Sequence, residues 1–263
     1  NTSVTGVQTC ALPISRALAA RGLAVEIVEG GSHLLRSQVG EAAGAILARD
    51  LRRRGTEVYC NARAVRLTGA GLVLDNGYTL ETDLVVLTAG GRPSVSLARE
   101  AGLAVRRGVV VDDRLTTDDP RISALGDCAE HDGRTPGFVA PAWEQAAVLA
   151  GVLLDGAAPH RYEGSRVVTR LRAPDLEVAV LGDPEHTEGE RVEVSNPLRH
   201  SHRCLVMREG RIVAATLVGD LSRVGLITQH FDRGTRLGPT EAGRLLLGEP
   251  APAADLEIGR AHV

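Results

Sequence analysis

The first third of the chain alternates between helical and extended hydrophobic patterns. Ser15–Gly22 has apolar residues at helical spacing and stops at a glycine, and Leu23–Glu29 is an apolar strand that ends on an acid. Val39–Arg54 is a second helical pattern, with Gly55 as its stop. Short strands are predicted next at Glu57–Cys60, Ala64–Leu67, Leu72–Leu74, Tyr78–Glu81 and Leu84–Leu87. The last of these is apolar throughout, which predicts a fully buried strand.

The pattern changes after Gly102. Val109–Val111 and Ile122–Leu125 predict short strands, the second ending in Gly126-Asp127, and Ala140–Leu154 predicts a helix. Beyond Ala157 the predicted elements are strands at Arg166–Leu171, Glu177–Leu181, Arg191–Val194, Arg203–Met207 and Arg211–Val218, then helices at Leu221–Phe231 and Thr240–Leu247. Glu249–Ala254 is rich in Pro and Ala and predicts a linker. The order indicates an α/β protein with a Rossmann-like nucleotide-binding part, followed by a smaller α+β part.

The two ends of the chain resemble translated sequencing adapter. Val4–Ile14 reads VTGVQTCALPI and Glu257–Val263 reads EIGRAHV. The codons GCT-CTT-CCG-ATC for Ala11–Ile14 are the reverse complement of GATCGGAAGAGC, a string contained in the codons GAG-ATC-GGA-AGA-GCA for Glu257–Ala261. A signal peptide is disfavoured because no basic segment precedes an apolar one. We expect residues 1–15 and 257–263 to be adapter-derived and the authentic part, about Arg16–Leu256, to be an internal segment. It would then lack the first strand and the Gly-rich turn of its nucleotide-binding part.

Composition excludes several classes of protein. A net charge of -3, with all 30 basic residues arginine and no basic stripe, argues against a nucleic-acid partner, and no apolar run is long enough to span a membrane. The absence of lysine indicates a GC-rich coding sequence. Cysteines without a C-x-x-C pair suit the cytoplasm. His200, His202 and Cys204 would share one face of a strand, but adjacent same-face side chains give poor tetrahedral geometry, so we expect no metal site.

Four groups of residues are candidates for binding cofactors. Glu29 ends a strand, where a carboxylate can accept both ribose hydroxyls of an adenosine; no nearby arginine is evident to pair a 2′-phosphate, which favours NADH over NADPH. Small residues end the Leu84–Leu87 strand and would let a flat cofactor approach: Ala89, Gly90 and Gly91. Gly126 and Asp127 would lie at a strand's carboxyl end. A helix whose N-terminus suits an electron-rich ring opens with Pro141, Ala142, Trp143 and Glu144. The alternatives are a surface acid for Glu29, a turn aspartate for Asp127 and a core anchor for Trp143.

With these residues in place, the chain resembles the FAD- and NAD(P)H-dependent pyridine-nucleotide oxidoreductases. The resemblance rests on LTAGGRP, TTDDPRISALGDC and VAPAWEQAAVLA, in that order, and covers about Arg16–Leu256. Within that family, GDCAEH followed by APAWEQA is most similar to the flavoprotein part of the assimilatory nitrite reductase large subunit. The absence of a C-terminal His-Pro pair disfavours the disulfide-reductase branch.

The resemblance implies a division and a function. Residues 16–92 would form the NAD-binding domain, 93–158 the C-terminal part of the FAD-binding domain, and 159–256 a C-terminal α+β domain. Asp127 would hold FAD, Glu29 and Gly90 would line the NADH site, and Ala142–Glu144 would lie near the isoalloxazine. The expected function is transfer of electrons from NADH through FAD to a downstream redox acceptor in nitrite or nitrate assimilation, with siroheme and iron–sulfur centres only outside this chain. No catalytic side chain is assigned.

Two alternatives stay open. One is an NADH-dependent ferredoxin or rubredoxin reductase. The other is a non-catalytic dinucleotide-binding module. We expect the parent protein to be an enzyme and this chain alone to be inactive, binding neither cofactor well.

Overall fold

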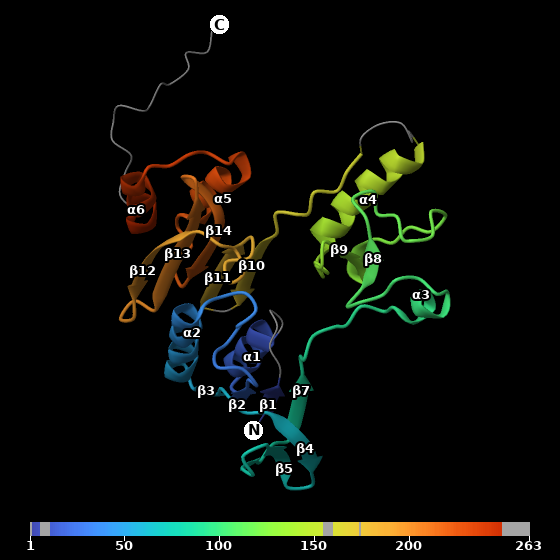
Figure 1. Ribbon diagram of the computed structural model, residues 1–263. Coiled ribbons are helices and arrows are strands. Elements are labelled where there is room, and N and C mark those ends of the chain that lie inside the picture. Colours follow the sequence, from blue (N-terminus) through green and yellow to red (C-terminus); the bar gives the residue numbers. More distant parts are fainter. Residues whose placement is uncertain (1, 6–10, 155–159, 174, 249–263) are drawn as a thin grey trace, which may run out of the picture. The chain divides into compact units, whose positions relative to one another are not determined.

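The computed structural model describes residues 2–5, 11–154, 160–173 and 175–248 (Figure 1). The chain divides into two compact units, one formed by Asn1–Gly90 with Val168–Val263 and the other by Gly91–Val167. The three-part division expected from the sequence, with boundaries after residues 92 and 158, stays a prediction. In the structure its first and last parts share a core.

The first unit is built on a parallel sheet with the strand order β3-β2-β1-β7. Its strands are β1 (Thr2–Thr5), β2 (Val25–Val28), β3 (Thr56–Tyr59) and β7 (Leu84–Leu87). Two helices cross between the parallel strands, α1 (Ala11–Ala20) from β1 to β2 and α2 (Glu41–Arg53) from β2 to β3. Alternating strands and helices around a parallel sheet confirm the predicted Rossmann-like α/β class.

The position of the first strand is filled by Thr2–Thr5, which lies in the segment expected to be adapter-derived, so the expectation that the authentic part lacks its own first strand stays a prediction. Thr2–Thr5 pairs in parallel with β2 on one side and with β7 on the other. This segment reads T-S-V-T, and its β-branched residues favour an extended backbone. The expected loss of the Gly-rich turn concerns residues 6–10, which lie outside the described residues, as do the linker at 249–254 and the adapter-like end at 257–263. The adapter origin stays a prediction.

The expectation that Leu84–Leu87 is fully buried is wrong. Among the described strands β7 is an edge strand of the parallel sheet, and Leu84 and Leu87 are 50% and 74% exposed. The four consecutive apolar residues predicted the strand with the right bounds. Burial depends on what covers each face, which a continuous apolar run does not determine.

An antiparallel meander covers one face of the parallel sheet. It consists of β4 (Ala64–Thr68), β5 (Gly71–Leu74) and β6 (Thr79–Leu80). Its buried leucines, among them Leu72 and Leu80, form a core with Val28 of β2. Because side chains alternate along a strand, Ile27 faces the opposite side and packs with the helices.

A five-stranded antiparallel sheet packs on the other side of α1 and α2. Its strands are β10 (Val168–Ala173), β11 (Leu176–Leu181), β12 (Glu190–Asn196), β13 (Ser201–Arg208) and β14 (Arg211–Val218), in the order β10-β11-β14-β13-β12. One face shares a core with α2, including Leu47, Val178 and Val218. The other face packs against α5 (Val224–Arg233) and α6 (Pro239–Leu247). Helices α1 and α2 therefore form a layer between two sheets (Figure 1).

The second unit is smaller and has little regular structure. It contains α3 (Ser96–Glu100), β8 (Val109–Val111), a 3₁₀ turn at Gly126–Cys128, β9 (Ala129–His131) and α4 (Val139–Leu154). Strands β8 and β9 pair in parallel, and their core includes Leu115, Ala129, Leu149 and Tyr162. This core positions the N-terminal half of α4 beside the 3₁₀ turn.

Candidate functional site

Two of the predicted residue groups meet at one edge of the parallel sheet. Val28 of β2 and Leu87 of β7 are both register partners of Thr5 in β1. Glu29 and the Thr88–Gly90 segment therefore leave the sheet at the same level, two strands or about 10 Å apart. The carboxyl ends of parallel strands are where α/β proteins bind ligands.

Glu29 is buried, and one of its carboxylate oxygens is already engaged. The side chain is 2% exposed, and its Oε1 accepts a hydrogen bond from the Gly31 amide at 2.5 Å. The Arg36 Nε lies 3.7 Å from the same oxygen. Burial raises the pKa of Glu29, and the Gly31 amide and Arg36 oppose that shift only in part. Both contacts use Oε1, and neither engages Oε2 in the part of the chain that the structure describes.

The expectation that no arginine lies near Glu29 is wrong. The loop after β2 turns back, so that Arg36 lies across Gly31, where a Cβ atom would overlap its side chain. The Arg63 side chain lies over Gly30, with its Cγ 3.3 Å from where a Cβ atom on that glycine would be. Sequence reasoning missed both arginines because they are seven and 34 residues from Glu29, and their approach depends on the tertiary path of the loops.

Ala89, Gly90 and Gly91 form an exposed connection after β7. All three are exposed, and Gly90 has a φ of +84°. Gly90 is the last residue of the first unit and Gly91 the first of the second. Only Ala89 and Gly90 are placed beside the Glu29 edge; their role in binding stays a prediction.

The expected strand at Ile122–Leu125 does not form, and this changes the setting of Gly126 and Asp127. Ser123 makes only an isolated bridge to Thr116, and Gly126–Cys128 is a 3₁₀ turn that precedes β9. Gly126 has a φ of +75°, which interrupts an extended backbone. Asp127 therefore lies before a strand, where it is exposed. Within the described residues its carboxylate has no recorded partner.

The second unit brings the 3₁₀ turn and the start of α4 together. The buried Gln145 accepts a hydrogen bond through Oε1 from the Gly126 amide at 2.7 Å. A Cβ atom on Gly126 would lie 3.8 Å from the Ala142 Cβ. The helix begins at Val139, two residues before Pro141, and Pro141 is buried in its first turn. Gln145 is a site residue that the sequence reasoning missed, because its contact joins residues 19 apart.

Gln145 also supplies an unsatisfied donor. Its Nε2 is buried and, within the described residues, has no hydrogen-bond partner. An orphaned buried donor beside Gly126 fits a ligand that brings an acceptor atom. Trp143 is 72% exposed, and Glu144 accepts a hydrogen bond from the Ser165 hydroxyl. Trp143 is therefore not a core anchor within the described residues.

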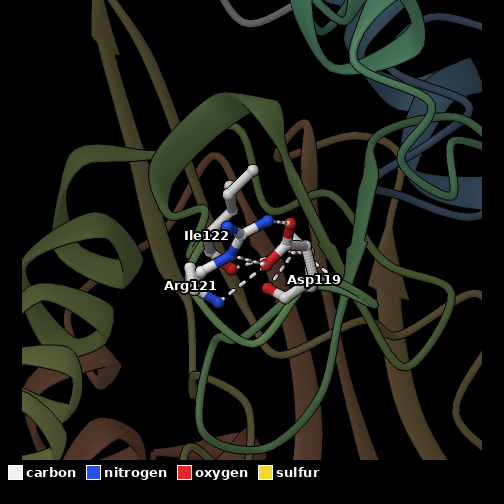
Figure 2. A network of polar contacts seen from close by, with 4 residues as sticks. Asp119, Arg121 and Ile122 are labelled. Carbon is white, nitrogen blue, oxygen red and sulfur yellow. Dashed lines mark hydrogen bonds and ion pairs between the residues drawn. The ribbon is translucent and has the colours of Figure 1, made fainter.

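A polar network shapes the loop that leads to the 3₁₀ turn (Figure 2). Arg121 donates from Nε and Nη2 to the two Asp119 carboxylate oxygens at 3.0 and 2.8 Å. The Thr117 hydroxyl lies 3.0 Å from the carbonyl oxygens of both Asp119 and Ile122. The Arg121 side chain and amide lower the pKa of Asp119. Arg121 is 86% exposed and Asp119 25%, so the network orders a surface loop rather than forming a buried ion pair.

Other chemistry-bearing residues lie away from these groups. His200 has a left-handed φ of 51° and precedes β13, so it does not continue the strand alternation of His202 and Cys204. The His202 Nδ1 is 2.7 Å from the Ser195 hydroxyl. In the part of the chain that the structure describes, no three His, Cys, Asp or Glu side chains are grouped to hold a metal ion. Among the described helices, none is long and apolar enough to cross a bilayer.

A cleft lies in the first unit, between α2 and two turns of the antiparallel sheet. It has a volume of about 100 Å³, and its lining includes Asp50, Arg54 and His200. None of the ten predicted cofactor residues lines it. The cofactor candidates are instead at strand and helix ends.

Several known proteins are similar to this chain in sequence or in fold. A nitrite reductase [NAD(P)H] of Bacillus subtilis is 34% identical over 225 residues, which cover 84% of this chain and 28% of that protein. A nitric oxide reductase FlRd-NAD(+) reductase of Vibrio vulnificus is 34% identical over 63% of this chain and 44% of its own length. The ferredoxin reductase for the CYP199A2 system of Rhodopseudomonas palustris has the same fold, with a TM-score of 0.80 and 23% identity over 95% of this chain and 64% of that one.

The chain thus spans between about a quarter and a half of the length of these two curated relatives. The family model described as pyridine nucleotide-disulphide oxidoreductase matches residues 2–146, more than half of the chain. This match includes the parallel sheet, the 3₁₀ turn and the start of α4. The chain belongs to the pyridine nucleotide-disulphide oxidoreductase family, which implies that it takes part in binding FAD and NAD(P)H.

Proposed function

We propose that this chain is part of a flavoprotein reductase that passes electrons from NADH through FAD to a downstream redox centre in nitrite or nitrate assimilation. The observation that carries the proposal is the buried Glu29 carboxylate at the ligand-binding edge of the parallel sheet. The similarity to a nitrite reductase over 84% of the chain supports the pathway. An assimilatory nitrate reductase electron transfer subunit of Bacillus subtilis, 31% identical over 64% of the chain, supports the same assignment.

The first unit would hold the adenosine half of the nicotinamide cofactor. Glu29 Oε2 would accept hydrogen bonds from the ribose hydroxyls, while the Gly31 amide fixes the carboxylate through Oε1. Ala89 and Gly90, with no bulky side chain at the same sheet edge, would let the cofactor lie close to the backbone. The residues present therefore fit a dinucleotide.

The second unit would hold part of FAD. The exposed Asp127 carboxylate would accept a hydrogen bond from a ribitol hydroxyl, and the Gln145 Nε2, which has no partner among the described residues, would donate one. The N-terminus of α4 directs amide groups and the positive end of its dipole toward the electron-rich ring edge. When bound, the flavin converts hydride transfer into single-electron transfer; the protein supplies orientation and electrostatics.

The proposal is tested on the full-length gene product that carries this chain. It should show flavin absorbance as purified and reduce an electron-accepting dye with NADH. Glu29→Ala should raise the KM for NADH about tenfold, because it removes a charge-assisted hydrogen bond, and leave the flavin content unchanged. Asp127→Ala should lower the flavin content instead. Each variant is the control for the other.

A colourless full-length protein, or one that NADH does not reduce, would contradict the proposal and favour a non-catalytic dinucleotide-binding module.

A second candidate is an NADH-dependent ferredoxin or rubredoxin reductase. It is favoured by the 34% identity to the nitric oxide reductase FlRd-NAD(+) reductase of Vibrio vulnificus. The two functions differ in the electron acceptor. Rapid reduction of a small iron–sulfur protein supplied in trans, with no reduction of nitrite by the full-length protein, would favour the second candidate.

A further inference from the structure

The start of α4 carries a carboxylate to which the proposed function gives no role. Glu144 lies in the second turn of the helix, next to Gln145, and is exposed. Its Oε2 accepts a hydrogen bond from the Ser165 hydroxyl. Within the described residues this is its one recorded contact, so Oε1 has no protein partner there and faces solvent.

Ser165 is itself held by a buried tyrosine. The Tyr162 hydroxyl oxygen is 2.6 Å from Ser165 Oγ, and Tyr162 is 4% exposed. A serine hydroxyl has one proton, and that of Ser165 is donated to Glu144. Tyr162 is therefore the donor to Ser165, and the two hydroxyls form a chain that ends on the carboxylate. Successive hydrogen bonds that end on a charged acceptor strengthen one another.

Tyr162 is fixed from its other side. The His131 ring meets the tyrosine ring edge-on, with the centroids 5.0 Å apart. His131 Nε2 is 3.0 Å from Asp113 Oδ1, and Arg161 Nη1 is 3.4 Å from Asp113 Oδ2. These three are the charged or titratable groups recorded around Tyr162 in the described part of the chain. The position of Glu144 is thus set by the core of the second unit as well as by the helix that carries it.

The proposed function leaves one proton to be removed near the start of α4. NADH gives up two electrons and one proton together, as a hydride. A downstream centre that takes electrons one at a time takes no proton, so one proton remains for each NADH oxidised. A positioned base speeds the removal of such a proton. Among residues 139–146, Glu144 is the one ionisable side chain.

We propose that Glu144 accepts this proton on Oε1, with Ser165 and Tyr162 as positioning residues. The inference rests on the proposed function, because it concerns the flavin end of the same electron path. The proton bonds to a lone pair of Oε1, the carboxylate becomes a neutral acid, and the hydrogen bond from Ser165 to Oε2 is kept. Since Glu144 is exposed, the acid then loses the proton to bulk water. The two electrons leave separately to the one-electron acceptor, so one hydride is accounted for.

Stopped-flow reoxidation tests the base. The FAD-loaded full-length gene product is reduced with one equivalent of NADH and then mixed with ferricyanide, which takes electrons singly. Glu144→Gln should slow reoxidation at least about tenfold, because an amide does not take up the proton. The wild-type rate should fall in acid, where the carboxylate is protonated, whereas the rate of Glu144→Gln should not. His131 is present in both proteins, so its own titration cancels in the comparison.

The midpoint potential of the bound flavin gives a readout at equilibrium. Glu144→Gln removes a negative charge from the start of α4, which the proposed function places at the electron-rich ring edge. The potential measured by spectroelectrochemical titration should therefore become more positive. Glu163→Gln is the matched control, because Glu163 is exposed, belongs to the same unit and its loss changes the net charge equally. It should leave both the potential and the reoxidation rate unchanged.

Three variants test the two positioning residues. Ser165→Ala and Tyr162→Phe should each slow reoxidation about threefold, because each removes one hydrogen bond of the chain, and should leave the flavin content unchanged. Ser165→Thr keeps the hydroxyl and should keep the wild-type rate. Tyr162→Phe keeps the ring against His131, so its effect reports on the hydroxyl rather than on packing.

The outcomes separate this inference from the proposed function. Full flavin content and normal reduction by NADH, with Glu144→Gln equal to the wild type in reoxidation rate and pH profile, would overturn the inference alone. Equal slowing by Ser165→Thr and Ser165→Ala would overturn the positioning role of the Ser165 hydroxyl. A full-length protein without flavin would overturn the proposed function, and with it this inference.

Discussion

At the scale of single residues, Glu29 shows how a buried carboxylate can oppose folding. A carboxylate withdrawn from water is stabilised only as far as its hydrogen bonds and nearby charges replace hydration. Glu29 is 2% exposed, and its recorded partners are one amide and one arginine 3.7 Å away. Its raised pKa means that this replacement is incomplete. An unfilled oxygen at a ligand-binding edge is expected when a ligand supplies the missing donors.

Glu29→Gln should therefore stabilise the protein at neutral pH. The folded-state pKa is raised, so stability is highest below the unfolded-state pKa of about 4.3 and falls as the pH rises through the folded-state value. Glutamine keeps an acceptor for the Gly31 amide and carries no charge. The melting temperature of the variant should exceed that of the wild type by a few degrees at neutral pH and match it near pH 4.

Thermal unfolding followed by circular dichroism at both pH values measures this difference. Glu57→Gln, at an exposed position on β3, is the control and should show no pH-dependent gain. A lower melting temperature for Glu29→Gln at neutral pH would show that Arg36 and Gly31 compensate the charge fully.

At the scale of elements, α2 connects the two sheets of the first unit. Its buried residues lie on more than one face, because the parallel sheet covers one side and the antiparallel sheet another. Arg54 extends this connection with ion pairs to Asp50 at 2.8 Å and to Asp175, in the turn after β10, at 3.3 Å. The helix should therefore couple the unfolding of the nucleotide-binding part to that of the antiparallel sheet.

Leu47→Ala tests that coupling. Leu47 is fully buried in the shared core, and its truncation should cost about 2–5 kcal/mol through lost burial and a cavity. The unfolding midpoints reported by probes of tertiary structure in the two sheets of the first unit should shift together to lower denaturant concentration. Leu198→Ala is the matched control, because Leu198 is 92% exposed, and it should change stability by less than about 0.5 kcal/mol. Separate transitions of the two sheets in the Leu47 variant would contradict the coupling.

How well each element could be predicted depends on whether its contacts are with residues near or far along the chain. The bounds of β7, β8 and β14 follow directly from apolar runs between turn residues. The exposure of β7 and the pairing of Thr2–Thr5 do not follow from such local patterns, because each depends on neighbours far along the chain. The strand expected at Ile122–Leu125 fails because Gly126 has a positive φ and Ser123 makes only a single bridge.

The candidate site was predictable to the same extent. Glu29 and the Gly126-Asp127 pair have local signals, an acid at a strand end and a Gly-Asp step. No local sequence signal marks Arg36, Arg63 or Gln145, since tertiary folding brings their side chains to the site. Sequence patterns therefore indicated the backbone corners of the candidate site but missed the long side chains that converge on them.

At the scale of the whole molecule, the two units differ in how they are stabilised. The first unit buries several hydrophobic clusters between its layers. The second has one small core, and α4 buries only Pro141, Gln145 and Leu149 while Trp143, Leu153 and Leu154 are largely exposed. A small core gives little net stability, so the second unit should unfold first.

Differential scanning calorimetry should resolve two transitions, each sensitive to its own variants. Leu47→Ala should lower only the upper transition. Gly126→Ala should lower only the midpoint of the lower-temperature transition. A side chain at a φ of +75° is strained, so the variant should destabilise the second unit by about 1–2 kcal/mol. Gly91→Ala is its matched control, since a Cβ atom there meets nothing within 4 Å. A single transition that both Leu47→Ala and Gly126→Ala displace equally would mean that the units fold as one cooperative body. Two independent transitions would mean that the Gly126-Asp127 turn of the second unit is ordered separately from the Glu29 edge. A ligand that binds one unit should then raise its transition without moving the other.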